Sequence, residues 1–277
     1  MTATHHLTRT TALRWLRRGS LALSLGLAGL AHAHTPYLLP ATFEVEPGST
    51  VSVDAAFTEK FFLPDVAFGD TRFAITTPDG SVLPFSDVRQ FKTRTVAEQK
   101  LPGAKGTYRL STGPRLGAIF RSWNLNGKVE VARDPATPLP AGAKLLSHYQ
   151  SLSISEAYVT AGAPTKVALA PSGKGLEIVP VTHPSDLFVG EAFEFTVQFN
   201  GQPLAEQKVD IYRSAMDLAS QHSAESLKTD AQGRIRYAMK QPGVYLALIR
   251  HRAPAPEGAA APMYGNNYTL TFRVLAQ

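Results

Sequence analysis

The sequence predicts an all-β protein with two antiparallel β-sandwich domains that follow a signal peptide. Apolar and polar residues alternate through most of the chain, as in TFEVEPGSTVSVDAAF and EAFEFTVQFNGQPL, and a period of two is typical of half-buried strands. Turn-forming pairs such as Pro47-Gly48 separate these stretches. We therefore expect a signal peptide over 1–33, an N-terminal β-sandwich over 34–171 and a C-terminal β-sandwich over 175–277.

The first 33 residues have the order of an export signal. Residues 1–20 contain four arginines and no acidic residue, and an apolar run from Leu21 to Ala31 follows. This run is too short to span a bilayer. Ala31-His32-Ala33 fits the small-x-small rule of signal peptidase, so we expect cleavage after Ala33, with cleavage after Ala31 as the alternative. We expect the protein in the periplasm.

The N-terminal domain is predicted from several strands and turns. Asn126-Gly127 lies between two alternating stretches and is a strong signal for a two-residue hairpin. Residues 133–143 form a proline-rich loop, and the stretch SHYQSLSISEAYVTAG after it fits either a helix or a strand. We favour a strand there because of its β-rich surroundings. The short break APSGKG at 170–175 is the predicted domain boundary.

The C-terminal domain is predicted to be immunoglobulin-like or transthyretin-like. Its strands alternate cleanly, they are joined by short turns such as Asn200-Gly201, and YTLTFRV closes the chain. The best helix candidate is SAMDLASQHSAE, starting at Ser214.

Composition narrows the classes of function. The chain has a net charge of +6, but the predicted signal removes four arginines and no acidic residue, which leaves about +2. We therefore expect no nucleic-acid partner. The chain has no cysteine, so any site for a soft metal depends on histidines, carboxylates and the terminal amine. No second apolar stretch is long enough for a transmembrane helix.

His34 is the main candidate metal ligand. After cleavage behind Ala33 it would be the first residue, and its α-amine and Nδ1 would close a six-membered chelate ring on a metal. Pro36 has no amide proton, so the backbone supplies no third nitrogen there. Cleavage after Ala31 would instead expose His32-Ala33-His34, an arrangement that holds Cu(II) or Ni(II) in a square plane. The alternative is that His34 merely follows the cut.

Four other histidines remain after cleavage. His251 ends the strand GVYLALIRH and shares a face with Tyr245 and Ile249. We expect it to be the first additional ligand and His148 the next, although a strand-end histidine near solvent is the plainer interpretation of each. His183 lies in a turn before proline, and His222 lies in a polar stretch.

Aromatic residues supply a second kind of candidate contact. Core packing is the expected role for most of them, and we expect one of the adjacent phenylalanines in EKFFLPD to face outward as an apolar contact. The aromatics considered for a ligand groove are Tyr37, Phe57, Phe61, Phe62, Trp123 and Tyr264.

The chain also resembles a bacterial periplasmic family of unknown function. The segments AHAHTPYLLP, VEPGSTVSVDAAFTEKFF and TDAQGRIRYAMKQPGVYLALIRH carry the resemblance. Members of this family are commonly described as periplasmic components of cobalt or nickel uptake systems. The resemblance implies that His34 and His251 are ligands. Thr35-Pro36 replaces the acidic or aromatic residue that often follows the first histidine, which leaves the identity of the metal open.

These observations predict a binding protein that is not an enzyme. We expect it to bind nickel, cobalt or copper as a divalent ion and to present the metal to a membrane uptake transporter. The alternative is a non-catalytic β-sandwich interaction module that binds a protein or a glycan, with the histidines incidental. A copper enzyme with an N-terminal histidine brace is the third possibility, and it would need a second histidine and a flat exposed face.

Overall fold

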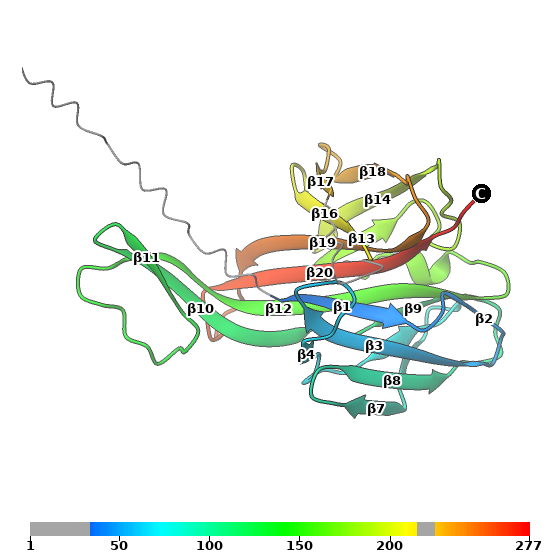
Figure 1. Cartoon of the computed structure of the whole chain (residues 1–277), viewed down its shortest axis with the longest axis horizontal. Coiled ribbons are helices and arrows are strands. Elements are labelled where there is room, and N and C mark those ends of the chain that lie inside the picture. Colours follow the sequence, from blue (N-terminus) through cyan, green and yellow to red (C-terminus); the bar gives the residue numbers. More distant parts are fainter. Residues whose placement is uncertain (1–33, 215–224) are drawn as a thin grey trace, which may run out of the picture. The chain divides into compact units, whose positions relative to one another are not determined.

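The computed structural model describes residues 34–214 and 225–277, and these residues form three β-sheets (Figure 1). The predicted signal peptide, His222 and most of the helix candidate SAMDLASQHSAE lie outside the described residues. One 3-10 turn, η1 (Val167–Leu169), is the only helical element in the described part of the chain. The all-β prediction is thereby confirmed.

The largest sheet has eleven strands and runs through the middle of the molecule (Figure 1). Its main path follows the order β17-β16-β19-β20-β12-β9-β5-β6, while β10 pairs with β12 and β11, and β2 pairs with β12. Its strands are β2 (Glu44–Val45), β5 (Ala74–Thr76), β6 (Val82–Pro84), β9 (Gly106–Ser111), β10 (Arg115–Leu125), β11 (Lys128–Ala132), β12 (Lys144–Ala161), β16 (Lys208–Arg213), β17 (Glu225–Lys228), β19 (Gly243–Pro254) and β20 (Met263–Val274).

Two smaller sheets complete the fold. The five-stranded sheet has the order β1-β3-β8-β7 with β4 paired to β3, and the four-stranded sheet has the order β13-β14-β15 with β18 paired to β14. Their strands are β1 (Thr35–Pro40), β3 (Thr50–Thr58), β4 (Val66–Ala67), β7 (Asp87–Gln90), β8 (Thr95–Lys100), β13 (Leu176–Pro180), β14 (Ala192–Phe199), β15 (Gln202–Pro203) and β18 (Arg234–Ala238).

Each small sheet covers one face of the large sheet. The middle of β19 is apolar on both sides, with Tyr245 to Ile249 all buried, so both of its faces need a cover. On β19, Tyr245 and Ile249 pack into a core with Phe193 and Phe195 of the four-stranded sheet. On the same strand, Leu248 packs instead with β1 and its surroundings. A third core joins β3 and β8 to β9 and β12.

The large sheet contains strands from both predicted domains. β12 belongs to 34–171 and β20 to 175–277, and the two pair in parallel over eight residues, from Gln150–Tyr264 to Ala157–Thr271. The break at 170–175 is a loop in which the backbone amides of Ser172 and Gly173 donate to the Glu177 carboxylate. The division into two sandwich domains stays a prediction, and proteolysis near this loop would test it.

Two local predictions, a hairpin turn at Asn126-Gly127 and a strand after residue 143, are confirmed. Asn126-Gly127 forms the β10–β11 turn with φ values of 54° and 84°, as expected for a hairpin turn that needs positive φ at both positions. The ambiguous stretch after residue 143 is strand β12, as favoured.

The prediction that one of the adjacent phenylalanines faces outward is wrong. Phe61 is buried, and the ring centroid of Phe62 lies 5.1 Å from that of Tyr37. Both phenylalanines join the core with Leu246 and Leu248. Full burial of Phe61 and partial burial of Phe62 remove more apolar area from water than an outward-facing ring would.

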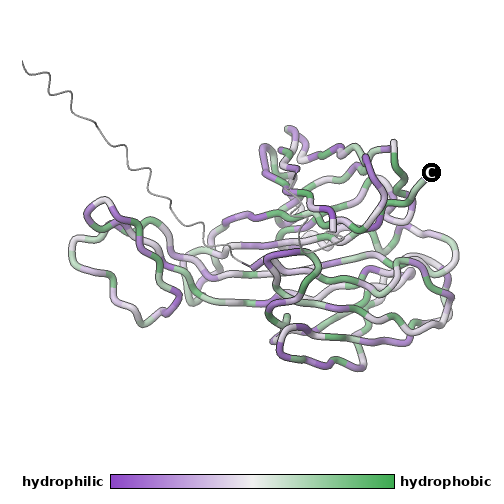
Figure 2. Tube along the Cα trace, in the orientation of Figure 1, coloured by the Kyte–Doolittle hydropathy of each residue, from purple (hydrophilic) through white to green (hydrophobic). Residues whose placement is uncertain are grey.

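A long arm extends from one end of the fold. β10, β11 and the first part of β12 project beyond the other strands, together with the proline-rich loop 133–143 (Figure 1). Hydrophobic and hydrophilic segments are interspersed along the arm (Figure 2). Its exposed apolar residues include Val129, Val131, Leu139, Leu145 and Leu146.

Candidate functional site

The candidate site is a pocket of about 440 Å³ at the base of the arm. It lies on the face of the large sheet that β1 and β3 cover, at the point where that cover ends. His34 and Phe57 line it from this cover, and Tyr149, Arg252 and Asn267 line it from the large sheet. A volume of this size falls in the range of small-molecule sites.

Strand register explains why these side chains meet. Arg250 and Arg252 of β19 are paired with Asn267 and Gly265 of β20. Directly paired residues point to the same face of a sheet. Ser151 of β12 is paired in turn with Gly265, so a polar floor extends across three strands.

Two glycines leave space above this floor. A Cβ atom on Gly265 would lie 2.6 Å from Cδ2 of Tyr149, and a Cβ atom on Gly117 would lie 3.2 Å from an amino group of Arg115. Such distances are too short for ordinary packing. The absent side chain at Gly265 therefore allows the Tyr149 ring to lie against β20.

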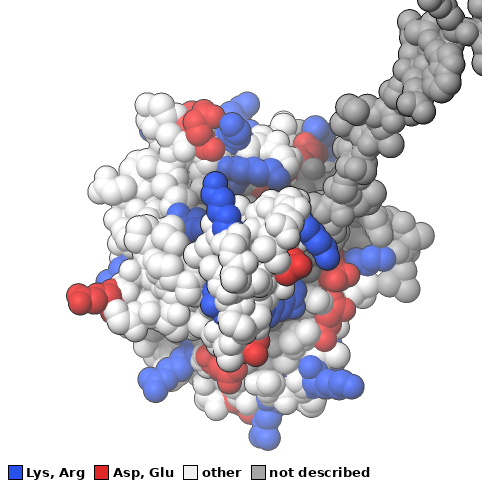
Figure 3. Space-filling view, turned by 90° about the vertical axis from the view of Figure 1, so that its left-hand side faces the viewer, with Lys and Arg blue, Asp and Glu red and all other residues white. Residues whose placement is uncertain are grey.

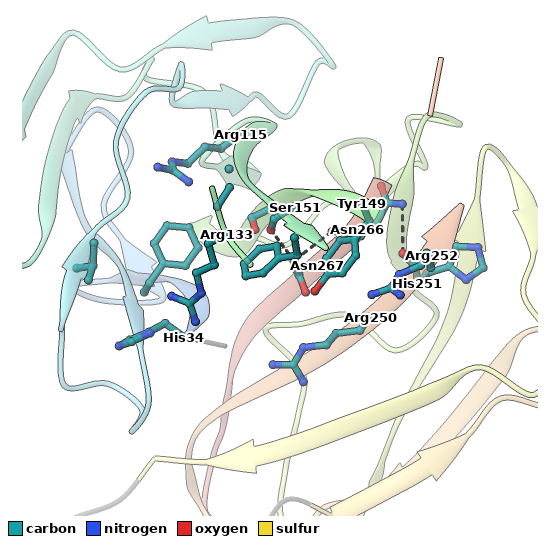
Figure 4. Close-up of a pocket in the computed structure, with 17 residues that line it drawn as sticks. His34, Arg115, Arg133, Tyr149, Ser151, Arg250, His251, Arg252, Asn266 and Asn267 are labelled. Carbon is teal, nitrogen blue, oxygen red and sulfur yellow. Dashed lines mark hydrogen bonds between the residues drawn. The ribbon is translucent and has the colours of Figure 1, made fainter. Parts of the chain in front are cut away.

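Aromatic rings and guanidinium groups form a stacked series in the pocket. The rings of Phe120 and Tyr149 stack with centroids 5.2 Å apart and planes at 17°. The guanidinium carbon of Arg252 lies 3.8 Å from the Tyr149 centroid, and that of Arg133 lies 5.4 Å from the Phe120 centroid. Figure 4 shows Arg133 on one side of Tyr149 and Arg252 on the other.

The remaining two arginines are held by hydrogen bonds. Arg250 donates from an amino nitrogen to the Thr35 hydroxyl over 3.0 Å. Arg115 donates through Nε to the Gly69 carbonyl over 2.8 Å, and its guanidinium lies 5.2 Å from the centre of the Phe57 ring. These contacts fix the directions of both guanidinium groups.

His34 lies at the edge of the pocket next to two carboxylates. Its Nε2 is 3.9 Å from Oε1 of Glu59 and 4.0 Å from Oδ2 of Asp65. The side chain is 39 % exposed. His34 is therefore accessible to a ligand from solvent, with two acidic oxygens nearby.

His251 also borders the pocket, but its ring lies on the other face of β19. The ring packs 4.9 Å from the centroid of Phe199, and Nδ1 lies 3.1 Å from Oε1 of Gln207. Burial lowers the pKa of the His251 ring because the charged form loses hydration. The predicted face shared with Tyr245 and Ile249 is confirmed by their common core.

The structure does not bring His148 to the same pocket. His148 borders a separate surface pocket on the arm with Leu145, Leu146 and Met263. His183 is engaged elsewhere, since its Nε2 lies 3.0 Å from the Thr107 hydroxyl and its Nδ1 lies 2.7 Å from the Ser185 hydroxyl.

The side chains around His34 do not make a metal site by themselves. Across residues 34–214 and 225–277, no group of three or more histidine, aspartate and glutamate side chains could hold a metal ion. A site at His34 would thus need the terminal amine that signal cleavage would release.

Sequence reasoning missed the arginines of the pocket. Arg250, His251 and Arg252 are consecutive, and the alternation of Leu246 and Leu248 passes into Arg250 and Arg252 on the same face. This change from apolar to basic side chains on one face is the signal that would have found them. Arg115 and Arg133 are far away in sequence, and the pairing of β10 with β12 and of β11 with β10 brings them near.

The fold and the pocket define a multi-sheet β-protein with a ligand-sized, arginine-lined cavity. Residues 31–253 match a family described as a domain of unknown function, DUF4198. The chain belongs to this family, which agrees with the expected membership in a family of unknown function. No curated protein has a sequence that matches this chain.

Several solved structures are similar to the chain at low identity. The Yersinia pseudotuberculosis adhesin InvE is 17 % identical, with 88 % of this chain and 61 % of that chain covered and a TM-score of 0.23. The D0-D1 domain of intimin is 14 % identical, with 85 % and 96 % covered and a TM-score of 0.21. The FN1-FN3 domains of chicken CNTN1 are 8 % identical, with 87 % and 98 % covered and a TM-score of 0.23.

These similarities carry no conclusion about function, because the TM-scores are low. The chain spans about six-tenths of the length of the InvE structure. Among the described residues, no helix has the length and apolar character that crossing a membrane would require.

Proposed function

We propose that the protein is a non-catalytic β-sandwich binding module, exported to the periplasm, that holds its ligand in the arginine-lined pocket. The observation that carries the proposal is the convergence of four arginines, several amide and hydroxyl groups and two stacked rings on one cavity of about 440 Å³. A few converging polar groups in a largely pre-formed cavity are typical of small-molecule sites.

The contacts inside the pocket support binding. Asn267 donates from Nδ2 to the Ser151 hydroxyl and to the Gly265 carbonyl, each over 3.2 Å. Arg250 is anchored to Thr35. Such contacts fix the polar groups before a ligand arrives, and pre-organised groups lose less entropy on binding.

Native mass spectrometry of the protein purified from the periplasm tests this proposal. The expected result is a bound mass that disappears on denaturation and is greatly reduced in the Arg250→Gln, Arg252→Gln double variant. The matched control is the Arg234→Gln, Arg236→Gln double variant. It removes the same charge from two exposed positions of β18 outside the pocket. Retention of the same bound mass by the pocket variant would contradict the proposal.

Transition-metal binding at His34 is the second candidate function. The observation that favours it is that His34 is accessible at the edge of the pocket, with Glu59 and Asp65 beside it. His251 borders the same pocket, but its ring packs on Phe199 on the other face of β19. In this proposal the protein would bind nickel, cobalt or copper and present the ion to an uptake transporter.

Titration calorimetry with Ni(II) and Cu(II) tests the second candidate. Native mature protein should bind more tightly than an N-terminally tagged form or His34→Ala, because the tag converts the terminal amine into an amide and the substitution removes the ring. Binding should weaken as the pH falls, because protons compete with the metal for its nitrogen ligands. Equal affinity in all three forms would contradict metal binding at His34.

A further inference from the structure

The charged side chains that line the pocket are positive. Its lining contains Arg115, Arg133, Arg250 and Arg252, and none of its described residues is an aspartate or a glutamate. Three carboxylates of the described chain lie beside lining residues: Asp70 is 3.8 Å from Arg115, and Glu59 and Asp65 are near His34. Figure 3 shows the end of the molecule that carries the arm, where basic and acidic side chains both occur on the surface, so the one-sided charge is a property of the pocket lining.

Two of the arginines have no acceptor in the described part of the chain. Neither the guanidinium group of Arg133 nor that of Arg252 forms a hydrogen bond or an ion pair there, and each lies instead over an aromatic ring. A guanidinium that lies over a ring keeps its N–H groups available, and those groups match a carboxylate in a two-point contact. The positions over Phe120 and Tyr149 thus leave both arginines able to bind an oxyanion.

The stacked rings also restrict the motion of these guanidinium groups. A free arginine side chain loses up to about 2 kcal/mol of conformational entropy when it is ordered. Arg252 lies only 3.8 Å from the centre of the Tyr149 ring, and Tyr149 is itself stacked on Phe120. Part of the ordering cost is therefore met before a ligand binds.

We infer that the pocket binds a small organic anion that carries two or more carboxylate groups. This inference rests on the proposed function and names its ligand class. Arg133, Arg250 and Arg252 have no ion-pair partner among the described residues, and three such cations around one cavity call for more than one negative charge, since like charges that are brought together without counter-charges repel each other. The volume of about 440 Å³ leaves room for a carbon framework between the anionic groups.

Calorimetric titration of the mature protein, 34–277, with propane-1,2,3-tricarboxylate tests this inference. Acetate, inorganic phosphate and the uncharged triamide of the same acid are titrated at equal ionic strength, in buffer free of transition metals. The tricarboxylate should bind at least about tenfold more tightly than each of the other three, because only it can engage several arginines at once.

Variants then locate the site. Arg252→Gln and Arg133→Gln should each weaken tricarboxylate binding about tenfold, the order expected for a lost hydrogen bond to a charged group. Arg252→Lys keeps the charge but loses the planar pair of donors, so it should retain only part of the affinity. The matched control Arg234→Gln should change the affinity by less than about twofold, and circular dichroism confirms that each variant is folded.

The inference is overturned if the tricarboxylate binds no better than acetate, or if Arg234→Gln weakens binding as much as Arg252→Gln does. Tighter binding of inorganic phosphate would also overturn it, because the ligand would then be a phosphate. If native mass spectrometry shows a bound mass that needs Arg250 and Arg252 while the tricarboxylate fails to bind, the proposed function stands and only this ligand class is wrong.

Discussion

The two faces of β19 behave differently after Ile249. On one face, Tyr245, Ile249 and the His251 ring stay in contact with the four-stranded sheet, so burial continues to the end of the strand. On the other face, Leu246 and Leu248 are buried, while Arg250 and Arg252 are exposed. The same strand is thus a core element on one side and the wall of a pocket on the other.

The difference follows from how far each covering sheet extends. β1 begins at Thr35, and Thr35 accepts a hydrogen bond from Arg250. Beyond that point the five-stranded sheet no longer covers β19, whereas Phe199 of the four-stranded sheet still reaches His251. A sheet that is covered on one face only presents polar side chains on the other. The pocket forms where the five-stranded sheet ends and the four-stranded sheet on the opposite face of β19 continues.

The largest expected effect is on the fully covered face. Phe193→Ala removes a ring that is 0 % exposed and lies 4.8 Å, between ring centroids, from Phe272. The free energy of unfolding should fall by about 3–5 kcal/mol, because the ring leaves a cavity that the core fills only partly. Urea unfolding followed by circular dichroism measures the change. A loss below about 1 kcal/mol would contradict the continuous core described for this face.

A smaller effect is expected on the pocket face. Gly265→Ala places a Cβ atom 2.6 Å from the Tyr149 ring, so the ring must shift. We expect a loss of about 1–3 kcal/mol in the free energy of unfolding, together with weaker binding of the pocket ligand.

Gly103→Ala is the matched control for that variant. A Cβ atom at Gly103 meets nothing within 4 Å, and its φ is not in the left-handed region. Its stability and ligand affinity should therefore stay close to those of the unmodified protein. If Gly265→Ala behaves in the same way, the Tyr149 ring does not depend on the space at Gly265.

A still smaller effect is expected from the pH dependence of His251. Burial lowers the pKa of its ring in the folded state, so the unfolded chain binds a proton more readily below about pH 6.5. The free energy of unfolding therefore does not depend on His251 above that pH. It decreases as the pH falls toward the lowered pKa, because the unfolded state takes up the proton first. Metal-free protein and His251→Asn are compared by urea unfolding at pH 8 and pH 5. The variant should lose less stability between the two pH values, and an equal loss would contradict the burial of the ring.

The smallest effect is expected from a cut in the loop at 171–175. The two chain segments share the large sheet through the parallel pairing of β12 and β20, and many backbone hydrogen bonds hold them together. After limited proteolysis, the two fragments should therefore stay associated and elute together in size-exclusion chromatography without denaturant. Separation of the fragments without loss of their β-structure would instead support two independent domains.

The sequence by itself determined the elements that depend on neighbours in the chain. Period-two alternation predicted the all-β class, because a strand with one buried and one solvated side needs that pattern. Asn126-Gly127 and Asn200-Gly201 predicted turns, since asparagine and glycine tolerate the positive φ that all four residues adopt. The face of His251 followed from its position in an alternating strand.

Only the tertiary structure decided which residues form the pocket. Arg115 lies well over one hundred residues before Arg252 in the chain, and the two meet because β10 pairs with β12 while β12 pairs with β20 and β20 with β19. Alternation assigns each side chain to a face, but it does not determine which strands become neighbours or where a covering sheet ends. Phe62 shows the same limit, since its partial burial depends on contact with Tyr37 from β1. Long-range pairing sets these contacts, and no local pattern encodes it.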